Sequence, residues 1–191
     1  MYKATPLSRL NAADGMATPQ AQAEYEKFYD TLGGKPVHHT LATHWARLIE
    51  LLYAAEHWLE LARDRDITGK DFRVLPTETP TEGVGCVEAP RGTLTHHYVT
   101  DERGILTKAN LIVGTTNNNA PISMSVKKAA QSLIHKGKVS EGLLNMVEMG
   151  FRAYDPCFGC ATHSLPGQMP LQVTIRGPGG EVLDRLSQHV G

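Results

Sequence analysis

Residues 37–65 read VHHTLATHWARLIELLYAAEHWLELARDR, and this run decides how the first half of the chain folds. Apolar side chains recur in it at three- and four-residue steps, as on one face of an α-helix. These positions are Leu41, Trp45, Leu48, Ile49, Leu52, Ala55, Trp58, Leu59 and Ala62. The spacing predicts one long helix over 37–65 and predicts that both tryptophans pack in the core.

Shorter helices are expected on both sides of this run. Thr18 before Pro19 is typical of a helix start, which predicts a helix over about 18–31. Two more are expected over about 121–135 and 140–154, the second ending before Pro156. Prolines and glycines make the N-terminal residues before position 18 and the segment 73–90 look irregular.

Strand-forming residues gather in two later stretches. Residues 93–100 and 105–113 flank the turn Asp101-Glu102-Arg103-Gly104, which predicts an antiparallel β-hairpin over about 93–113. A strand at 171–175 and its partner at 181–186 give the C-terminal tail β character. The expected fold class is therefore α+β and mainly α-helical, a helix cluster with a small hairpin that forms part of a larger domain.

The overall composition is that of a soluble globular chain. It has 191 residues, 41% hydrophobic and 20% charged, with a net charge of −1. This balance gives no electrostatic case for nucleic acid, and no apolar run is long enough to cross a membrane. The N-terminus lacks the pattern of a signal peptide, so a cytoplasmic location is expected.

The main chemical motif is DPCFGCATH at residues 155–163. Two thiols at the spacing of Cys157 and Cys160 can bind one soft or borderline metal ion such as zinc, copper(I), nickel or iron. The chain has three cysteines in all, so only Cys86 remains and four thiolates cannot be assembled. The motif is half of a metal site.

Spacing alone leaves three interpretations of this half-site open. It could be a structural zinc site completed by Cys86, His96 or His97. It could be a thiol redox pair, although no thioredoxin-like pattern surrounds it. It could also be a catalytic metal site that another chain completes.

Several motifs together resemble the large subunit of [NiFe] hydrogenases. DPCFGCATH at 155–163 is similar to that family's C-terminal signature, and EAPRGTLTHHY at 88–98 is similar to an upstream segment. LIVGTTNN at 111–118 and PLSRLN at 6–11 add two further matches, although Gly114 replaces the family's usual proline. The motif forms suggest the cytoplasmic, cofactor-coupled branch, which is NAD-reducing or F420-non-reducing and linked to heterodisulfide reductase.

The resemblance implies metal ligands at four positions. Cys157 would be a terminal nickel ligand, and Cys160 would bridge nickel to an iron that carries cyanide and carbon monoxide. His163 and the carbonyl of Leu111 would bind a nearby magnesium-type ion.

It also implies a set of residues around the open coordination position. Pro90, Arg91 and Asp155 would form a canopy over it, with Arg91 and Asp155 polarising H₂ or donating to a cyanide nitrogen. The hydroxyl of Thr115 would bind the second cyanide.

The resemblance covers only the C-terminal two-fifths or so of a large subunit. The family's second Cys-x-x-Cys pair, which supplies two more nickel thiolates, is absent from the 191 residues. The Ni–Fe centre is therefore expected to be absent or incomplete in this chain, which would be inactive alone. Its implied partners are an iron–sulfur small subunit and the N-terminal portion of the large subunit.

Two segments follow from the resemblance. Residues 1–163 would be the C-terminal part of the large-subunit domain, and residues 164–191 would be an extension of the type that a maturation endopeptidase removes. The presence of these last residues predicts an unprocessed precursor.

The alternative function is a non-catalytic zinc-binding or assembly module that uses Cys157 and Cys160. As a piece of a larger domain, the chain is also expected to expose apolar surface on the helix at 37–65, which would normally face the missing half, and self-association would hide it.

Overall fold

The computed structural model describes residues 2–163 and 171–188. The helices are α1 (Pro6–Ala12), α2 (Pro19–Leu32), α3 (Ala42–Arg63), α4 (Asn119–Leu133), α5 (Glu141–Arg152) and α6 (Phe158–Thr162), with 3-10 helices η1 (Arg65–Thr68) and η2 (Gly114–Asn118). The strands are β1 (Glu82–Ala89), β2 (Gly92–Thr100), β3 (Leu106–Ile112), β4 (Leu171–Arg176) and β5 (Val182–Gln188). The expected α+β class with mainly helical content is confirmed. No helix among the described residues has the length and hydropathy needed to span a bilayer.

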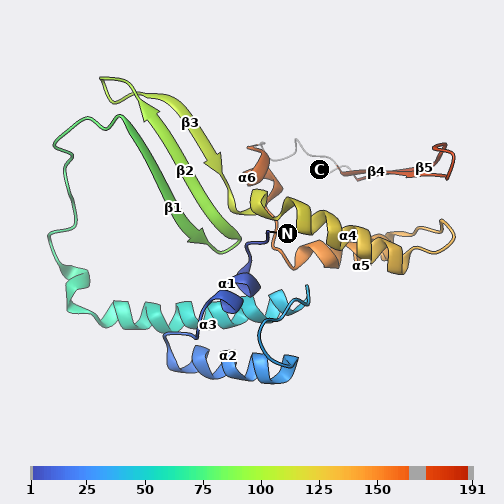
Figure 1. Cartoon of the computed structure of the whole chain (residues 1–191), viewed down its shortest axis with the longest axis horizontal. Coiled ribbons are helices and arrows are strands. Elements are labelled where there is room, and N and C mark those ends of the chain that lie inside the picture. Colours follow the sequence, from blue (N-terminus) through green and yellow to red (C-terminus); the bar gives the residue numbers. More distant parts are fainter. Residues whose placement is uncertain (1, 164–170, 189–191) are drawn as a thin grey trace.

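The hydrophobic core lies where α1, α2 and the first half of α3 meet (Figure 1). Leu7, Phe28 and Ile49 supply one fully buried side chain from each helix. The ring of Phe28 meets that of Trp45 edge to face, with centroids 5.2 Å apart. This packing fixes the direction of α3 and therefore of the side chains that α3 presents outside the core.

The second half of α3 leaves the core and exposes its apolar residues. Trp58 is 75% exposed and Leu51 64% exposed, so the prediction that both tryptophans are buried is wrong for Trp58. The helix also begins at Ala42 rather than at Val37. The apolar residues occur all around this part of α3, and the described residues pack against only part of its circumference. The expectation that this helix exposes apolar surface is confirmed.

Strands β1, β2 and β3 form one antiparallel sheet in that order, which projects away from the helices (Figure 1). The hairpin expected at 93–113 is present as β2 and β3, with His96 opposite Leu111. The expectation that 73–90 is irregular is wrong for β1. Gly83 and Gly85 weaken its strand pattern, but backbone ladder bonds to β2 hold it as an exposed edge strand.

Helices α4 and α5 pack together beside the sheet base. Gly150 of α5 faces Ser125 and Ala129 of α4, and a Cβ there would lie 3.6 Å from each, in ordinary van der Waals contact. The Tyr154 hydroxyl lies 3.0 Å from that of Ser125 and donates to the carbonyl of Pro121. The C-terminal strands β4 and β5 pair as expected, with Val173 opposite Leu186.

Two short helices were not expected from the sequence. Helix α1 begins after Thr5, whose side chain accepts from the N–H of Ser8, with Pro6 in the first turn. The Thr5 cap and Pro6 are both helix-start signals, but this helix is too short to show a periodic apolar pattern in the sequence. Helix α6 starts directly after Cys157.

Asn118 ties three distant segments together. Its side chain is 1% exposed, accepts from the N–H of Ala4 at 2.9 Å and donates to the carbonyls of Ala4 and Arg91 at 2.7 and 3.0 Å. Gly92 lies at the same junction with φ 139°, and a Cβ there would be 2.9 Å from the carbonyl oxygens of Ala4 and Gly114. The N-terminus, the β1–β2 turn and η2 therefore meet at one point.

Substitution Asn118→Ala tests this junction. It would leave buried backbone groups of Ala4 and Arg91 without partners, which should lower the free energy of unfolding by about 2–4 kcal/mol. Urea denaturation measures the change. The neighbouring exposed Asn119 provides a control, since Asn119→Ala should change stability by about 0.5 kcal/mol or less. Equal effects of the two variants would contradict the role of Asn118.

Candidate metal centre

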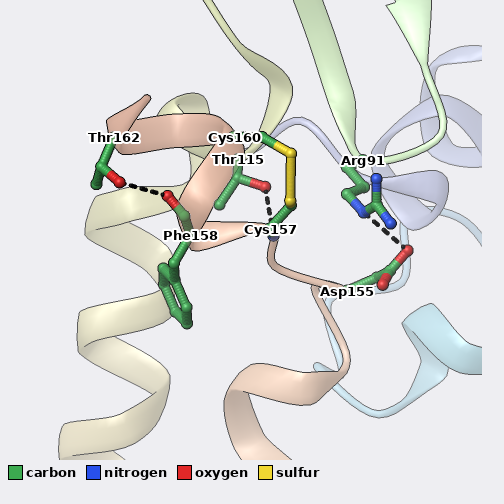
Figure 2. The surroundings of a disulfide bond; sticks show 7 residues. All are labelled: Arg91, Thr115, Asp155, Cys157, Phe158, Cys160 and Thr162. Carbon is green, nitrogen blue, oxygen red and sulfur yellow. Dashed lines mark hydrogen bonds and ion pairs between the residues drawn. A yellow bond between two sulfur atoms is a disulfide. The ribbon is translucent and has the colours of Figure 1, made fainter. Parts of the chain in front are cut away.

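Cys157 and Cys160 lie at the first turn of α6 and face each other (Figure 2). Their Cα atoms are 5.3 Å apart and their sulfurs form a disulfide. The residues between them form a turn of helix, which places residues three apart on one face. After reduction the two thiolates could bind one metal ion from the same side.

Thr115 fixes the start of α6. This threonine is buried in η2, and its Oγ1 accepts the N–H of Cys157 at 3.0 Å. A hydroxyl that accepts one hydrogen bond still has its proton to donate. The sequence-predicted residue Thr115 therefore lies next to the cysteine pair, with a donor available beside it.

Arg91 and Asp155 form an ion pair, and Asp155 lies two residues before Cys157 in the chain. Figure 2 shows the two side chains pointing toward each other, and Arg91 Nε lies 3.2 Å from Asp155 Oδ2. Both side chains are 45% exposed. Asp155 has φ 51°, a left-handed conformation that aspartate tolerates better than most residues. The turn between α5 and Pro156 thus aims its carboxylate at Arg91.

Side chains from α1 and α3 hold the backbone just before Arg91. Arg9 donates to the carbonyls of Ala89 and Pro90 at 3.0 and 3.1 Å. The same guanidinium forms two 2.6 Å bonds with the carboxylate of Glu50 on α3. This bidentate pair is largely buried, with 18% and 23% side-chain exposure, so it is a firm anchor for Pro90.

Arg47 is a third arginine at the site. It lies on α3, and burial lowers the pKa of its guanidinium, while the nearby carboxylate of Asp155 opposes that shift. The sequence alone missed Arg9, Glu50, Arg47 and Asn118 as site residues. Arg9 lies in the matched motif PLSRLN and Asn118 in the matched motif LIVGTTNN, whereas Arg47 and Glu50 had no motif signal.

The other expected metal ligands, His163 and the Leu111 carbonyl, do not form a metal site with other described residues. His163 is exposed at the end of α6, and Leu111 lies in β3 opposite His96. Within residues 2–163 and 171–188, no three His, Cys, Asp or Glu side chains cluster as a metal site. The magnesium-type site of His163 and Leu111 stays a prediction.

A zinc site completed from the sheet is likewise not assembled among the described residues. Cys86 is an exposed free thiol that accepts a hydrogen bond from the Thr95 hydroxyl. His97 pairs with Glu82 at 2.7 Å, and His96 contacts the Tyr98 hydroxyl at 2.6 Å. The donor set at α6 therefore fits half of a four-thiolate metal site.

Comparison with known proteins identifies the family. Residues 1–163 match the sequence profile of nickel-dependent hydrogenase. The chain belongs to this family. An F420-non-reducing hydrogenase iron-sulfur subunit from Archaeoglobus profundus is 52% identical over 97% of this chain and 38% of its own length. The NAD-reducing hydrogenase HoxS subunit beta of Cupriavidus necator is 48% identical over 96% of this chain and 38% of its own length.

A solved structure shows the same fold. The crystal structure of an NAD⁺-reducing [NiFe]-hydrogenase in the H₂-reduced state matches with a TM-score of 0.80 and 42% identity, over 85% of this chain and 36% of that chain. The expected resemblance to the NAD-reducing and F420-non-reducing types is confirmed. The chain spans 38% of the length of these two curated relatives, so it corresponds to part of a hydrogenase large subunit.

The disulfide predicts a defined thiol count. Without reductant, the unfolded chain should show one reactive thiol, that of Cys86, and after reduction it should show three. A thiol-reactive chromophore measures both values. In the control variant Cys86→Ser the counts should fall by one each. Three thiols in the untreated chain would show that Cys157 and Cys160 are a free dithiol.

Proposed function

We propose that this chain supplies one half of the Ni–Fe active site of a hydrogenase large subunit. The observation that carries the proposal is the meeting of Arg91, Thr115 and Asp155 with the Cys157–Cys160 pair, from four separate elements. The complete enzyme would interconvert H₂ with two protons and two electrons. A second portion of the large subunit, with another Cys-x-x-Cys pair, would complete the metal site.

The cysteine pair would hold the metal. Reduction of the disulfide by two electrons, with uptake of two protons, gives two thiols that lose those protons on binding metal. Cys157 and Cys160 would together hold the metal centre. When bound, the Ni–Fe centre with its cyanide and carbon monoxide ligands would supply the hydrogen chemistry. The Thr115 hydroxyl would donate a hydrogen bond to one cyanide nitrogen.

Arg91 and Asp155 would place a charged donor beside the metal. The nearest contact of the ion pair is at Arg91 Nε. The Nη nitrogens of the guanidinium carry further donors, which would serve a group at the open position. Asp155 keeps the guanidinium in one orientation, and Pro90 adds an apolar wall with no N–H of its own. The guanidinium does not lose its proton, so it acts by charge and orientation. The magnesium-type ion at His163 and the Leu111 carbonyl belongs to this proposal as well.

The partners follow from what the chain exposes and lacks. Apolar side chains of α3 and the segment after it face solvent, including Leu51, Trp58, Leu59, Phe72 and Val74. The rest of the large subunit, 62% of each relative's length, would cover this surface. Three cysteines cannot hold iron–sulfur clusters as well as the metal centre, so electrons would leave through an iron–sulfur small subunit.

Two further parts of the proposal come from the family resemblance. A maturation endopeptidase would cleave the extension at 164–191, and a chain that retains it would be an unprocessed precursor. The complex would be cytoplasmic, in keeping with the cofactor-coupled relatives. Both statements concern the assembled enzyme.

A second function is favoured by the presence of only two thiols at α6 together with the exposed apolar surface. Two copies of the chain could share one zinc ion through four thiolates and bury α3 against each other. This zinc-binding or assembly module would not be catalytic. Metal analysis separates the functions, since one zinc per two chains supports the module and nickel with iron supports the hydrogenase.

Reconstitution tests the proposed function. The chain, produced together with the N-terminal portion of a large subunit, the maturation proteins and the small subunit, should catalyse H₂-dependent reduction of a viologen dye. Cys157→Ala and Cys160→Ala should each abolish this activity, because each removes a metal ligand. Cys86→Ala is the matched control and should retain it. Turnover in either ligand variant would contradict the assignment.

Substitution Arg91→Lys tests the donor role in the same assay. Lysine keeps the charge but loses the planar fork, so kcat should fall about 10²-fold while nickel and iron contents stay unchanged. The exposed turn residue Arg103 provides the control, and Arg103→Lys should leave kcat as it is. A wild-type rate in Arg91→Lys would remove Arg91 from the mechanism.

A further inference from the structure

Arg47 contacts both segments that carry the proposed canopy. Its Nη1 lies 3.6 Å from Asp155 Oδ2 and donates to the carbonyl of Pro90 at 3.4 Å. Its Nη2 donates to the carbonyl of Ala153 at 3.2 Å. One guanidinium on α3 thus joins the Pro90–Arg91 segment to the turn that bears Asp155.

The Ala153 contact matters because of where that carbonyl lies. Ala153 caps the C-terminal end of α5, where carbonyls have no partner within the helix. A positive charge is favourable at this end of a helix. The guanidinium therefore stabilises the α5 terminus and holds the following turn, in which Asp155 has φ 51°.

Among the described residues, neither of the other two arginines at the site makes an equivalent set of contacts. Arg9 holds the carbonyls of Ala89 and Pro90 but donates to nothing in the 153–155 turn. Arg91 approaches Asp155 with Nε as its nearest nitrogen. The relative placement of Arg91 and Asp155 therefore depends on a third group that contacts both sides.

We propose that Arg47 is a positioning residue, which fixes the Asp155 carboxylate against Arg91 Nε by binding Asp155, Pro90 and Ala153 at once. The proposal rests on the proposed function for its catalytic meaning. Arg47 keeps the Asp155 carboxylate shared between two arginines. Asp155 then stays beside Arg91 Nε, which leaves the Nη groups to donate to a group at the open metal position.

The shape of the side chain is the decisive property. A guanidinium offers donors in a fixed plane and can bind three acceptors from two segments. A lysine ammonium carries the same charge as a compact point on a flexible stem. Lysine at position 47 should therefore fail to restore the placement, whereas a role limited to charge balance would be fulfilled by lysine.

The test measures the Arg91 Nε–H group by ¹H–¹⁵N NMR in the full, metal-free chain. Arg47→Lys and Arg47→Gln should each speed exchange of this proton with water about tenfold, because the Asp155 carboxylate 3.2 Å from Nε would no longer be held beside it. Arg63 lies exposed near the end of the same helix, so Arg63→Lys is the matched control and should change the rate less than about twofold.

Three results would overturn the proposal. The first is an exchange rate of the Arg91 Nε proton that is unchanged or slower in both Arg47 variants. The second is a wild-type exchange rate in Arg47→Lys when Arg47→Gln has a raised one. The third is an equal rise of the rate in Arg63→Lys. Should Arg47→Gln unfold the chain, Arg47→Lys decides alone, because it keeps the charge and most of the aliphatic stem.

A second readout ties the residue to turnover. In the reconstituted enzyme, Arg47→Lys should lower kcat about tenfold with KM for H₂ and nickel content unchanged. An unaltered kcat would contradict a positioning role in the reaction. If the unsubstituted complex shows no turnover, the proposed function fails, and the NMR result still decides whether Arg47 places Asp155.

Discussion

The site depends on hydrogen bonds from side chains to three consecutive backbone carbonyls, those of residues 89, 90 and 91. Arg9, held by Glu50, binds the first two, and Asn118 binds the third. Carbonyls at a tight turn cannot all be paired within the turn itself, so their partners must come from elsewhere in the chain. Because these partners lie in α1 and η2, the core packing of the helices sets where Arg91 points.

The sequence predicted the helices and strands that carry a regular residue pattern or a clear start signal. The start signal at Thr18 and Pro19 located α2, helical patterns located α3 to α5, and strand-forming residues located β2, β3, β4 and β5. Strand β1 was missed because an exposed edge strand is held by backbone bonds to β2, which leave no apolar pattern in its side chains. Trp58 was misplaced because periodicity shows that a helix has an apolar face but does not show whether the rest of the chain covers it.

The candidate site was predictable only in part. The cysteine pair is visible in the sequence, but the meeting of Arg91 with Asp155 came from the resemblance, since no local pattern links residues so far apart. The contacts of Arg9, Arg47 and Asn118 join side chains to carbonyls between 27 and 114 positions away. Backbone carbonyls carry no residue identity, so such contacts become evident only in three dimensions.

The incomplete donor set and the exposed apolar surface have one explanation. The described residues offer one thiolate pair at α6 and leave much of α3 uncovered, while the chain spans 38% of its relatives' length. The central claim is that a second portion of a large subunit supplies both the missing thiolates and the missing cover. A crystal structure of the assembled complex, with anomalous scattering recorded at the nickel edge, tests it most directly. The account predicts nickel bound by Cys157, Cys160 and a cysteine pair of that second portion, with Arg91 above the metal. Nickel bound elsewhere, or zinc shared between two copies of this chain at Cys157 and Cys160, would contradict it.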